Sequence, residues 1–297
     1  MQATKALQTT QGWREWVKIL SDIMKFRLSF LVVFSSGFGY ILASPTTVDW
    51  PTLLMFLLGG FLLSGASSIV NQILEREYDK LMPRTMNRPL PTGKVNVTEA
   101  AGLALIAGGL GLILIAQYTN ILTTSLAFLS FVLYSFVYTP LKRVGPIAVL
   151  VGAIPGALPP LLGWTAVSGL ITHDALIIFA IQFIWQFPHF WAIAWVADDD
   201  YRKAGFKLLP SKGGKTLQSA VQIMTYTLFL IPLGLLPLKF GITGVDSAIV
   251  ATICGVLFLG QTFRLMVDAS RKVALRIMFG SFIYLPVVQI AYLLDKV

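Results

Sequence analysis

The sequence has little charge, since Asp, Glu, Lys and Arg make up only 12% of its 297 residues. Soluble domains carry about 25% of these residues, so roughly half of the usual charge is missing. Hydrophobic residues instead make up 56% of the chain, and the mean hydropathy is +0.74. A soluble fold of this length has too little interior to bury so much apolar surface. The composition therefore predicts an integral membrane protein.

Cysteine and acidic residues are also scarce. The single cysteine, Cys254, excludes an intrachain disulfide. The 14 acidic and 23 basic residues give a net charge of +9, but the basic residues stand in short gaps between long apolar runs. This arrangement follows the positive-inside rule and differs from the clustered basic surface of a nucleic-acid-binding protein. We therefore expect no nucleic-acid partner.

The N-terminus lacks the pattern of a secretory signal peptide. Residues 1–27 are polar and amphipathic, and no small-residue cleavage site follows an apolar core. The pattern around Trp13 and Trp16 predicts a helix that lies in the membrane interface. We expect residues 1–25 to form a cytoplasmic or interfacial segment, and residues 26–297 to form one membrane domain.

Nine apolar runs are long enough to span a bilayer, because a spanning helix needs about 20 apolar residues. They cover roughly residues 26–44, 52–72, 98–117, 120–139, 144–166, 173–196, 217–238, 246–268 and 272–294. With a cytoplasmic N-terminus, 21 of the 23 basic residues fall on the cytoplasmic side, and only Lys239 and Lys296 do not. The sequence therefore predicts an all-α fold of nine membrane helices, with the N-terminus in the cytoplasm and the C-terminus outside.

The strongest chemical pattern follows the second apolar run, on the predicted cytoplasmic side. Asn71, Glu75 and Asp79 recur every four residues, which places three oxygen ligands on one helix face. Mg²⁺ prefers oxygen ligands and commonly combines one or two carboxylates with substrate phosphates. The pattern favours a magnesium site, and the alternative is a solvated helix end with charges at helical spacing.

Basic residues follow this stripe at positions suited to binding an anion. Arg84 and Arg88 lie in a proline-rich stretch that ends at Gly93, and their planar guanidinium groups match phosphate oxygens. Lys142 and Arg143 follow the fourth apolar run. Those two could bind a diphosphate or anchor the helix to lipid headgroups, and the sequence leaves both open.

A second acidic group, Asp198-Asp199-Asp200, opens the other long cytoplasmic loop. Three consecutive acids cannot all face one way on a helix, so at most two are expected to be ligands. Asp200 is the expected metal ligand, supported by Asp198 or Asp199. The alternative is a solvated acidic turn.

His189 lies within the sixth apolar run, on nearly one stripe with Gln182 and Gln186. Polar residues inside a membrane are costly and usually face an interior cavity. His189 could contact a polar edge of a substrate, ligate a haem iron or complete a buried hydrogen-bond network. The sequence does not choose among these roles.

These motifs resemble the two aspartate-rich motifs of the intramembrane polyprenyltransferases of the ubiquinone and menaquinone type. The pattern Asn-Gln-x-x-Glu-Arg-x-x-Asp-x-x-Met-x-Arg-Thr-x-x-Arg-Pro, from Asn71 to Pro89, is most similar to the haem-farnesylating branch of that family. So are the segments 185–190 (Trp-Gln-Phe-Pro-His-Phe) and 200–205 (Asp-Tyr-Arg-Lys-Ala-Gly). The chain departs from the wider family at Glu75, where Asp is usual, and at Val196, where the second motif has another Asp.

The resemblance implies nine helices around a central lipid-open cavity, in the inner or plasma membrane of a bacterium. It implies that farnesyl diphosphate binds through Mg²⁺, a catalytic cofactor held by Asn71, Glu75, Asp79 and Asp200. The leaving diphosphate would be neutralised by four basic residues, Arg84, Arg88, Lys142 and Arg143. The acceptor would be a vinyl group of haem B, contacted by His189, and the product haem O. A downstream haem-modifying membrane enzyme is a further expected partner.

Two other functions fit parts of the sequence. A prenyltransferase for an aromatic quinone precursor would use the same diphosphate motifs with a different acceptor. A secondary transporter would also have many spans, but transporters tend to place their polar residues at the bilayer midplane. Here the acids gather at one membrane face, which favours the enzyme.

Overall fold

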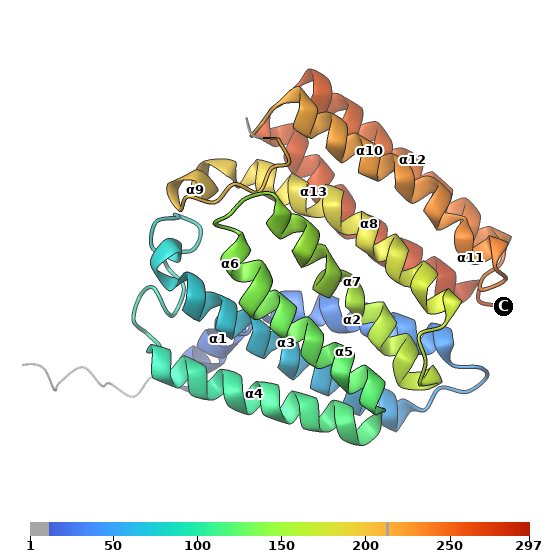
Figure 1. The fold of residues 1–297 in the computed structure, drawn as a ribbon, viewed down its shortest axis with the longest axis horizontal. Helices are drawn as coiled ribbons and strands as arrows, with labels where there is room; N and C mark the ends of the chain where they lie inside the picture. Colours follow the sequence, from blue (N-terminus) through green and yellow to red (C-terminus); the bar gives the residue numbers. More distant parts are fainter. Residues whose placement is uncertain (1–11, 212–213) are drawn as a thin grey trace, which may run out of the picture.

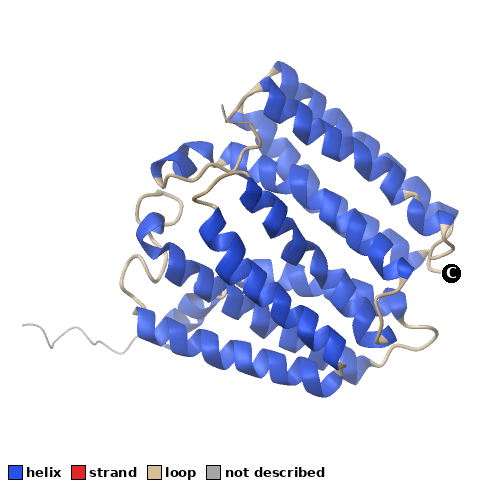
Figure 2. Ribbon diagram, in the orientation of Figure 1, coloured by secondary structure: helices blue, strands red, loops and turns tan. Residues whose placement is uncertain are grey.

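The computed structural model describes residues 12–211 and 214–297, and almost all of that chain is helical (Figure 1). Nine helical segments in the described residues are long and apolar enough to cross a membrane, which confirms the predicted number. They are α2 (Phe26–Ala43), α3 (Trp50–Asp79), α4 (Val97–Tyr118), α5 to α6 (Ile121–Leu141), α7 (Ile147–Ser168), α8 (His173–Val196), α10 to α11 (Leu217–Lys239), α12 (Val245–Val267) and α13 (Arg271–Leu294). The described residues contain no strand (Figure 2).

Two shorter helices lie outside the nine spans. Helix α1 (Trp13–Ile23) precedes α2 and buries Ile19 and Ile23 while Trp13 and Trp16 stay exposed, as expected for an amphipathic helix. Helix α9 (Asp198–Lys203) follows α8 directly. Both lie at the same end of the helix bundle as the connection between α3 and α4, whereas the C-terminus lies at the opposite end (Figure 1).

Local sequence signals account for the ends of the spans. The Asn96 side chain accepts from the Glu99 backbone N–H at 2.8 Å while Glu99 bonds back to the Asn96 N–H, a capping box that starts α4. Thr172 and Ser270 cap α8 and α13 in the simpler one-sided form.

Helix α3 is longer than the apolar run that predicted it. It continues without a break to Asp79 and has 30 residues, so its length is about 45 Å at 1.5 Å per residue. The hydrocarbon core of a bilayer is about 30 Å thick, so one end of α3 extends beyond it. Asn71, Glu75 and Asp79 therefore sit on a rigid helical extension and not in a loop.

The fourth span changes its winding close to its end. Residues Leu133–Tyr138 form a π-helix (η1) between α5 (Ile121–Val132) and α6 (Thr139–Leu141). Pro140 has no backbone N–H and cannot continue an ordinary helical ladder, and π-turns inside α-helices often occur at functional sites. The wider turn brings Tyr138 and Thr139 to the buried side of the span.

Helices α2 and α7 pack at backbone contact through two glycines. A Cβ atom on Gly39 would collide with the backbone carbonyl of Pro160, and one on Gly163 would collide with the backbone of Ser36. Close approach through small residues is typical of packing between membrane helices. The contact holds α2, which begins at the predicted site, against α7.

We expect Gly39→Ala to lower the free energy of unfolding by about 1–3 kcal/mol, because the added methyl group overpacks this contact. Gly109→Ala on α4 is the matched control, since a Cβ atom there meets nothing within 4 Å. Thermal unfolding of the purified protein in detergent measures both. Equal unfolding midpoints for the two variants would contradict the close α2–α7 contact.

Candidate functional site

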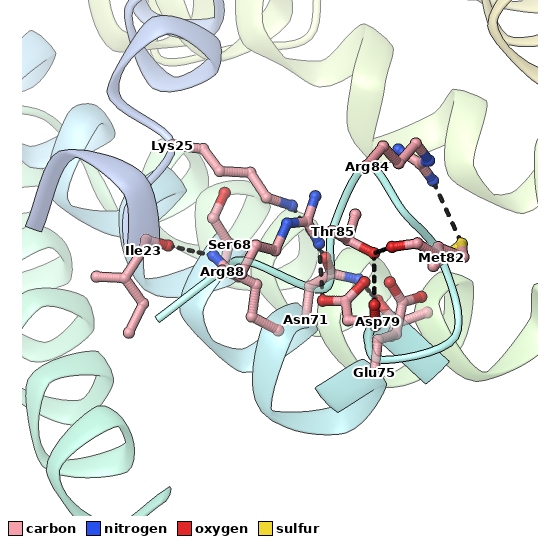
Figure 3. A network of polar contacts seen from close by, with 12 residues as sticks. Ile23, Lys25, Ser68, Asn71, Glu75, Asp79, Met82, Arg84, Thr85 and Arg88 are labelled. Atoms are coloured by element: carbon pink, nitrogen blue, oxygen red, sulfur yellow. Dashed lines mark hydrogen bonds and ion pairs between the residues drawn. The ribbon is translucent and has the colours of Figure 1, made fainter. Parts of the chain in front are cut away.

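Asn71, Glu75 and Asp79 lie on one buried face at the end of α3 (Figure 3). Their side chains are directed into the protein, and the side chain of Asp79 is only 1% exposed. The intervening Glu77 instead lies outside, where it pairs with Arg76 and Lys80. A solvated helix end would leave all of these acids in water, so the burial sets the stripe apart from its neighbours.

Each residue of this stripe has one basic partner. Lys142 Nζ lies 2.9 Å from Glu75 Oε1, and Arg88 Nη1 donates to Asp79 Oδ2 at 2.8 Å. Lys25 Nζ donates to Asn71 Oδ1 at 3.0 Å. Opposite charges removed from water must be paired in this way, because an unpaired buried charge is very costly.

Lys25 was not among the residues expected from the sequence. It stands between α1 and α2 with φ +48°, and it is the only non-glycine residue at positive φ among the described residues. Burial, and then the nearby Arg88 and Lys142 cations, lower the pKa of Lys25 to about 7. A lone lysine ahead of an apolar run gives no signal that separates it from the other flanking basic residues.

Lys142 faces the site and not the lipid headgroups. Its side chain is 11% exposed and lies over the ring of Tyr138, with Nζ 4.8 Å from the ring centroid. Burial lowers the pKa of Lys142, but the Glu75 carboxylate beside it, together with Tyr134 and Tyr201, outweighs that effect, and the pKa is raised. Lys142 is therefore held as a cation by Glu75.

Thr139 connects the π-helix to the stripe on α3. Its hydroxyl donates to the Tyr134 carbonyl at 2.9 Å and accepts from the Asn71 amide at 3.1 Å. The Asn71 side chain is thus fixed at both ends, by Thr139 on one side and Lys25 on the other. In this orientation the Asn71 amide oxygen faces the basic side chains of the site.

Arg84 and Arg143 lie on aromatic rings instead of carboxylates. The Arg84 guanidinium lies 4.6 Å from the ring centroid of Tyr201, and that of Arg143 lies 4.3 Å from the centroid of Tyr78. Cation–π contacts hold guanidinium groups in place while keeping their N–H groups available. Arg143 also donates weakly to the Leu74 carbonyl at 3.4 Å.

The two long loops meet through apolar side chains. Met82 and Phe206 are almost fully buried and pack with Ala204, against Tyr78 and Tyr201. The loop after α3 and the loop after α9 therefore form one joint structure at this end of the bundle. Sequence reasoning predicted two loops on one membrane side, and the structure adds the direct contact.

The segment 200–205 ends α9 in a Schellman motif. Phe206 N–H bonds to the Tyr201 carbonyl at 2.8 Å and Gly205 N–H to the Arg202 carbonyl at 3.1 Å. Gly205 has φ +74°, a conformation that only glycine adopts without strain. The turn brings Phe206 onto Tyr201, so the glycine fixes the apolar contact between the loops.

The three acids of α9 occupy different surroundings. Asp198 is buried and pairs with Arg202 at 2.9 Å and with Lys215 at 3.9 Å. Asp199 is exposed, and Asp200 is half-buried beside Lys203 at 3.7 Å. Tyr201 is the side chain of α9 that contacts Arg84. Among the described residues, the ion-pair partner of Asp200 is Lys203, and no ion pair joins Asp200 to the α3 stripe.

The oxygen ligands on α3 suit a hard cation whose remaining coordination positions are filled by a substrate. Asp79 Oδ1 is buried and has no hydrogen-bond partner among the described residues, so one carboxylate oxygen is available. No three His, Cys, Asp or Glu side chains in that part of the chain cluster as a full metal cage. Two carboxylates and an amide, with substrate phosphates for the remaining positions, match the usual coordination of Mg²⁺.

A row of aromatic rings leads from the charged site to His189. Tyr138, under Lys142, contacts Phe190 at 6.1 Å between centroids, and Phe190 contacts His189 at 5.7 Å. His189 in turn stacks on Trp185 at 4.3 Å. The row places His189 within three ring contacts of the Glu75–Lys142 pair, although α8 and α3 lie far apart in the sequence.

The hydrogen bond of His189 determines which ring nitrogen carries the proton. Ser281 Oγ donates its only proton to the Met278 carbonyl at 2.6 Å. The 2.9 Å contact between His189 Nδ1 and Ser281 Oγ must therefore have Nδ1–H as the donor. The neutral imidazole then keeps a lone pair on Nε2, the arrangement that a histidine needs to ligate a metal.

Gln182 and Gln186, on the same stripe, have a structural role. Both side-chain amides donate to the Gly156 carbonyl, at 2.9 and 2.7 Å. Gln182 also accepts from Gln289 at 2.9 Å, which ties α8 to α13. The two glutamines therefore belong to a buried hydrogen-bond network that joins α7, α8 and α13.

We expect Asp198→Ala to loosen the loop after α9, because it removes the buried carboxylate that holds Arg202 and Lys215. Limited trypsin digestion should then cut faster at Arg202, Lys203 or Lys207. Asp199→Ala is the control, since it removes only the exposed partner of Lys215 and leaves the buried pair of Asp198 with Arg202 intact. Equal cleavage rates in the two variants would show that Asp198 does not hold the loop.

Comparison with known proteins gives a family model and close relatives. Residues 32–285 match the model described as "UbiA prenyltransferase family". A protoheme IX farnesyltransferase of Cytophaga hutchinsonii is 54% identical over 93% of this chain and 96% of its own length. One from Christiangramia forsetii is 43% identical over 94% of both chains.

Solved structures share the fold at lower sequence identity. A digeranylgeranylglyceryl phosphate synthase superposes with a TM-score of 0.77 at 21% identity, over 95% of this chain and 98% of its own. A UbiA homologue from Archaeoglobus fulgidus bound to DMAPP and Mg²⁺ superposes with a TM-score of 0.65 at 15% identity, over 92% and 98%. These likenesses bear out the nine-helix fold.

Proposed function

The chain belongs to the UbiA prenyltransferase family, within its protohaem IX farnesyltransferases, and from that premise we propose how this haem-prenylating membrane enzyme works. It transfers the farnesyl group of farnesyl diphosphate to a vinyl group of haem B and so forms haem O. The observation that carries the proposal is the α3 stripe, in which Asn71, Glu75 and Asp79 are buried and each has a basic partner.

The stripe would hold Mg²⁺ together with the donor's diphosphate. Asn71, Glu75 and Asp79 supply oxygen ligands, and Asp79 Oδ1 is already free of a hydrogen bond among the described residues. The fold neighbour from A. fulgidus, bound to DMAPP and Mg²⁺, supports this assignment. When bound, the ion would stabilise negative charge on the diphosphate as the C–O bond breaks.

Asp200 would join the site only if α9 shifts toward α3, because its present partner is Lys203. Asp198 is more buried but is engaged with Arg202. We propose Asp200 as the Mg²⁺ ligand from the second loop, because Tyr201 beside it contacts Arg84.

Basic side chains would neutralise the leaving diphosphate. Lys142 and Arg88 reach the stripe directly, and Arg84 and Arg143 lie on aromatic rings with N–H groups available. Preorganised cations act where charge develops in the transition state. The buried tyrosine rings next to Lys142 exclude water and could face the allylic cation.

His189 would bind haem B through the iron, using the lone pair on Nε2. Its Nδ1–H bond to Ser281 fixes the ring orientation and the tautomer. The row of rings Tyr138, Phe190 and His189 would then lie between the donor's diphosphate and the haem. The π-electrons of a vinyl group would form the bond to carbon 1 of the farnesyl group as its bond to the diphosphate oxygen breaks. Water would then add to the resulting cation and lose a proton to solvent, which gives a hydroxyethylfarnesyl side chain.

The site would face the cytoplasm. Nearly all basic residues flank that end of the spans in the positive-inside pattern. Farnesyl diphosphate is charged, so a site at the cytoplasmic boundary lets its head stay near water while the chain enters the bilayer. The product stays in the membrane, where a further haem-modifying enzyme could take it.

We expect Glu75→Gln and Asp79→Asn each to reduce farnesyl transfer by about 10²-fold or more, as loss of transition-state charge stabilisation does elsewhere. Glu77→Gln is the matched control, because Glu77 lies on the same helix turn but is exposed. The measurement is haem O formation by membranes that contain equal amounts of each variant. Full activity in both site variants would refute the metal-site assignment.

The acceptor is tested by product mass. Membranes that contain the protein are incubated with farnesyl diphosphate, Mg²⁺ and either haem B or 4-hydroxybenzoate. We expect a hydroxyethylfarnesyl haem and no prenylated benzoate. Prenylation of the benzoate alone would instead assign an aromatic acceptor, with the diphosphate motifs unchanged in role.

Haem ligation is tested with the only two histidines of the chain, His189 and His173. We expect His189→Ala to abolish the histidine-ligated Soret spectrum of bound haem B, whereas His173→Ala should keep it. His173 is exposed at the other end of α8, beside Asp174. An unchanged spectrum in the His189 variant would show that the iron is not bound there.

A further inference from the structure

The charges around the α3 stripe do not balance. Lys142 and Arg88 are offset by the carboxylates of Glu75 and Asp79. Lys25 has no such partner, because its only hydrogen-bond acceptor among the described residues is the neutral amide of Asn71. The cluster therefore holds three basic side chains against two carboxylates, and an anion bound beside Lys25 would offset the excess positive charge.

The backbone at Lys25 also carries strain. A φ of +48° places a residue with a Cβ atom in the left-handed region, where such residues are strained and tend to occur at functional sites. Glycine or asparagine would adopt this turn more easily. With the backbone in this turn, the Lys25 side chain extends across to Asn71 (Figure 3).

Neighbouring bonds hold the turn in this shape. Gln72 Nε2 donates to the Ile23 carbonyl at 2.6 Å, and Ser29 Oγ donates to the Met24 carbonyl at 3.0 Å. Met24 packs directly against Gly65 of α3, where a Cβ atom would collide with it. The segment before α2 is thus fixed to the helix that carries the stripe, residue by residue.

We propose that Lys25 binds the diphosphate of the prenyl donor, as a further substrate-binding residue of this site. The inference rests on the proposed function for the diphosphate itself, but not on the identity of the acceptor. A divalent cation bound at Asn71 Oδ1 would repel the Lys25 ammonium group, which donates to that atom at 3.0 Å in the absence of the ion. The diphosphate bound to the same cation would then offer the ammonium group an opposite charge within the site.

A purely structural role for Lys25 makes a different prediction. If the lysine only braced Asn71, its loss would disturb the fold or the metal and would affect haem and donor alike. If it binds the diphosphate, its loss weakens the affinity for pyrophosphate and raises the KM for farnesyl diphosphate, while the KM for haem B stays unchanged.

The test uses three variants of the full chain, purified in detergent. Lys25→Asn removes the charge but keeps a residue that tolerates the left-handed turn. Lys25→Arg keeps the charge, and Arg27→Gln removes a nearby exposed charge that lies outside the site. The probe is inorganic pyrophosphate with Mg²⁺, titrated by calorimetry, followed by steady-state kinetics with farnesyl diphosphate and haem B.

We expect Lys25→Asn to raise the Kd for pyrophosphate roughly tenfold or more, as the loss of one charge-assisted contact does. Lys25→Arg should restore most of that affinity, and Arg27→Gln should match the unmodified chain. A Kd for Lys25→Asn equal to that for Arg27→Gln overturns the proposal, and so does an equal loss in Lys25→Arg and Lys25→Asn.

The two proposals fail in different ways. If the chain binds pyrophosphate through Lys25 but makes no haem O, the acceptor is wrong and the role of Lys25 stands. If the chain makes haem O and Lys25→Asn binds pyrophosphate normally, the proposed function stands and the role of Lys25 is wrong.

Discussion

The pairing of buried oxygen ligands with basic side chains at the end of α3 is the constraint on which the rest of the site depends. Glu75 and Asp79 could not be buried at this depth unless Lys142 and Arg88 offset their charge. The partners come from the loop after α3 and from the end of the fourth span. Helices distant in the sequence must therefore converge here before the site exists.

That convergence explains several features that would otherwise look unrelated. The extension of α3, the π-helix before Thr139 and the left-handed turn at Lys25 all bring polar groups to the same place. The glycine contact between α2 and α7 holds the helix that starts at Lys25. The aromatic row then connects the charged end of the bundle to His189, deeper in α8.

Much of this could be predicted from the sequence, because a bilayer demands long apolar helices and four-residue spacing defines a helix face. These two rules predicted the number of spans and the shared helix face of Asn71, Glu75 and Asp79. Lys25, Thr139 and Tyr201 could not, since their roles depend on contacts between distant segments. The choice among Asp198, Asp199 and Asp200 also depends on packing, because the structure buries Asp198 beside Arg202, exposes Asp199 beside Lys215 and half-buries Asp200 beside Lys203.

The central claim is that the α3 stripe binds a divalent cation together with a diphosphate. It is tested most directly by electron paramagnetic resonance of Mn²⁺ in place of Mg²⁺, with pyrophosphate bound to the purified protein. We predict a protein-bound Mn²⁺ signal with ³¹P coupling that is lost in Asp79→Asn and kept in Glu77→Gln. The same bound signal in both variants would contradict the account.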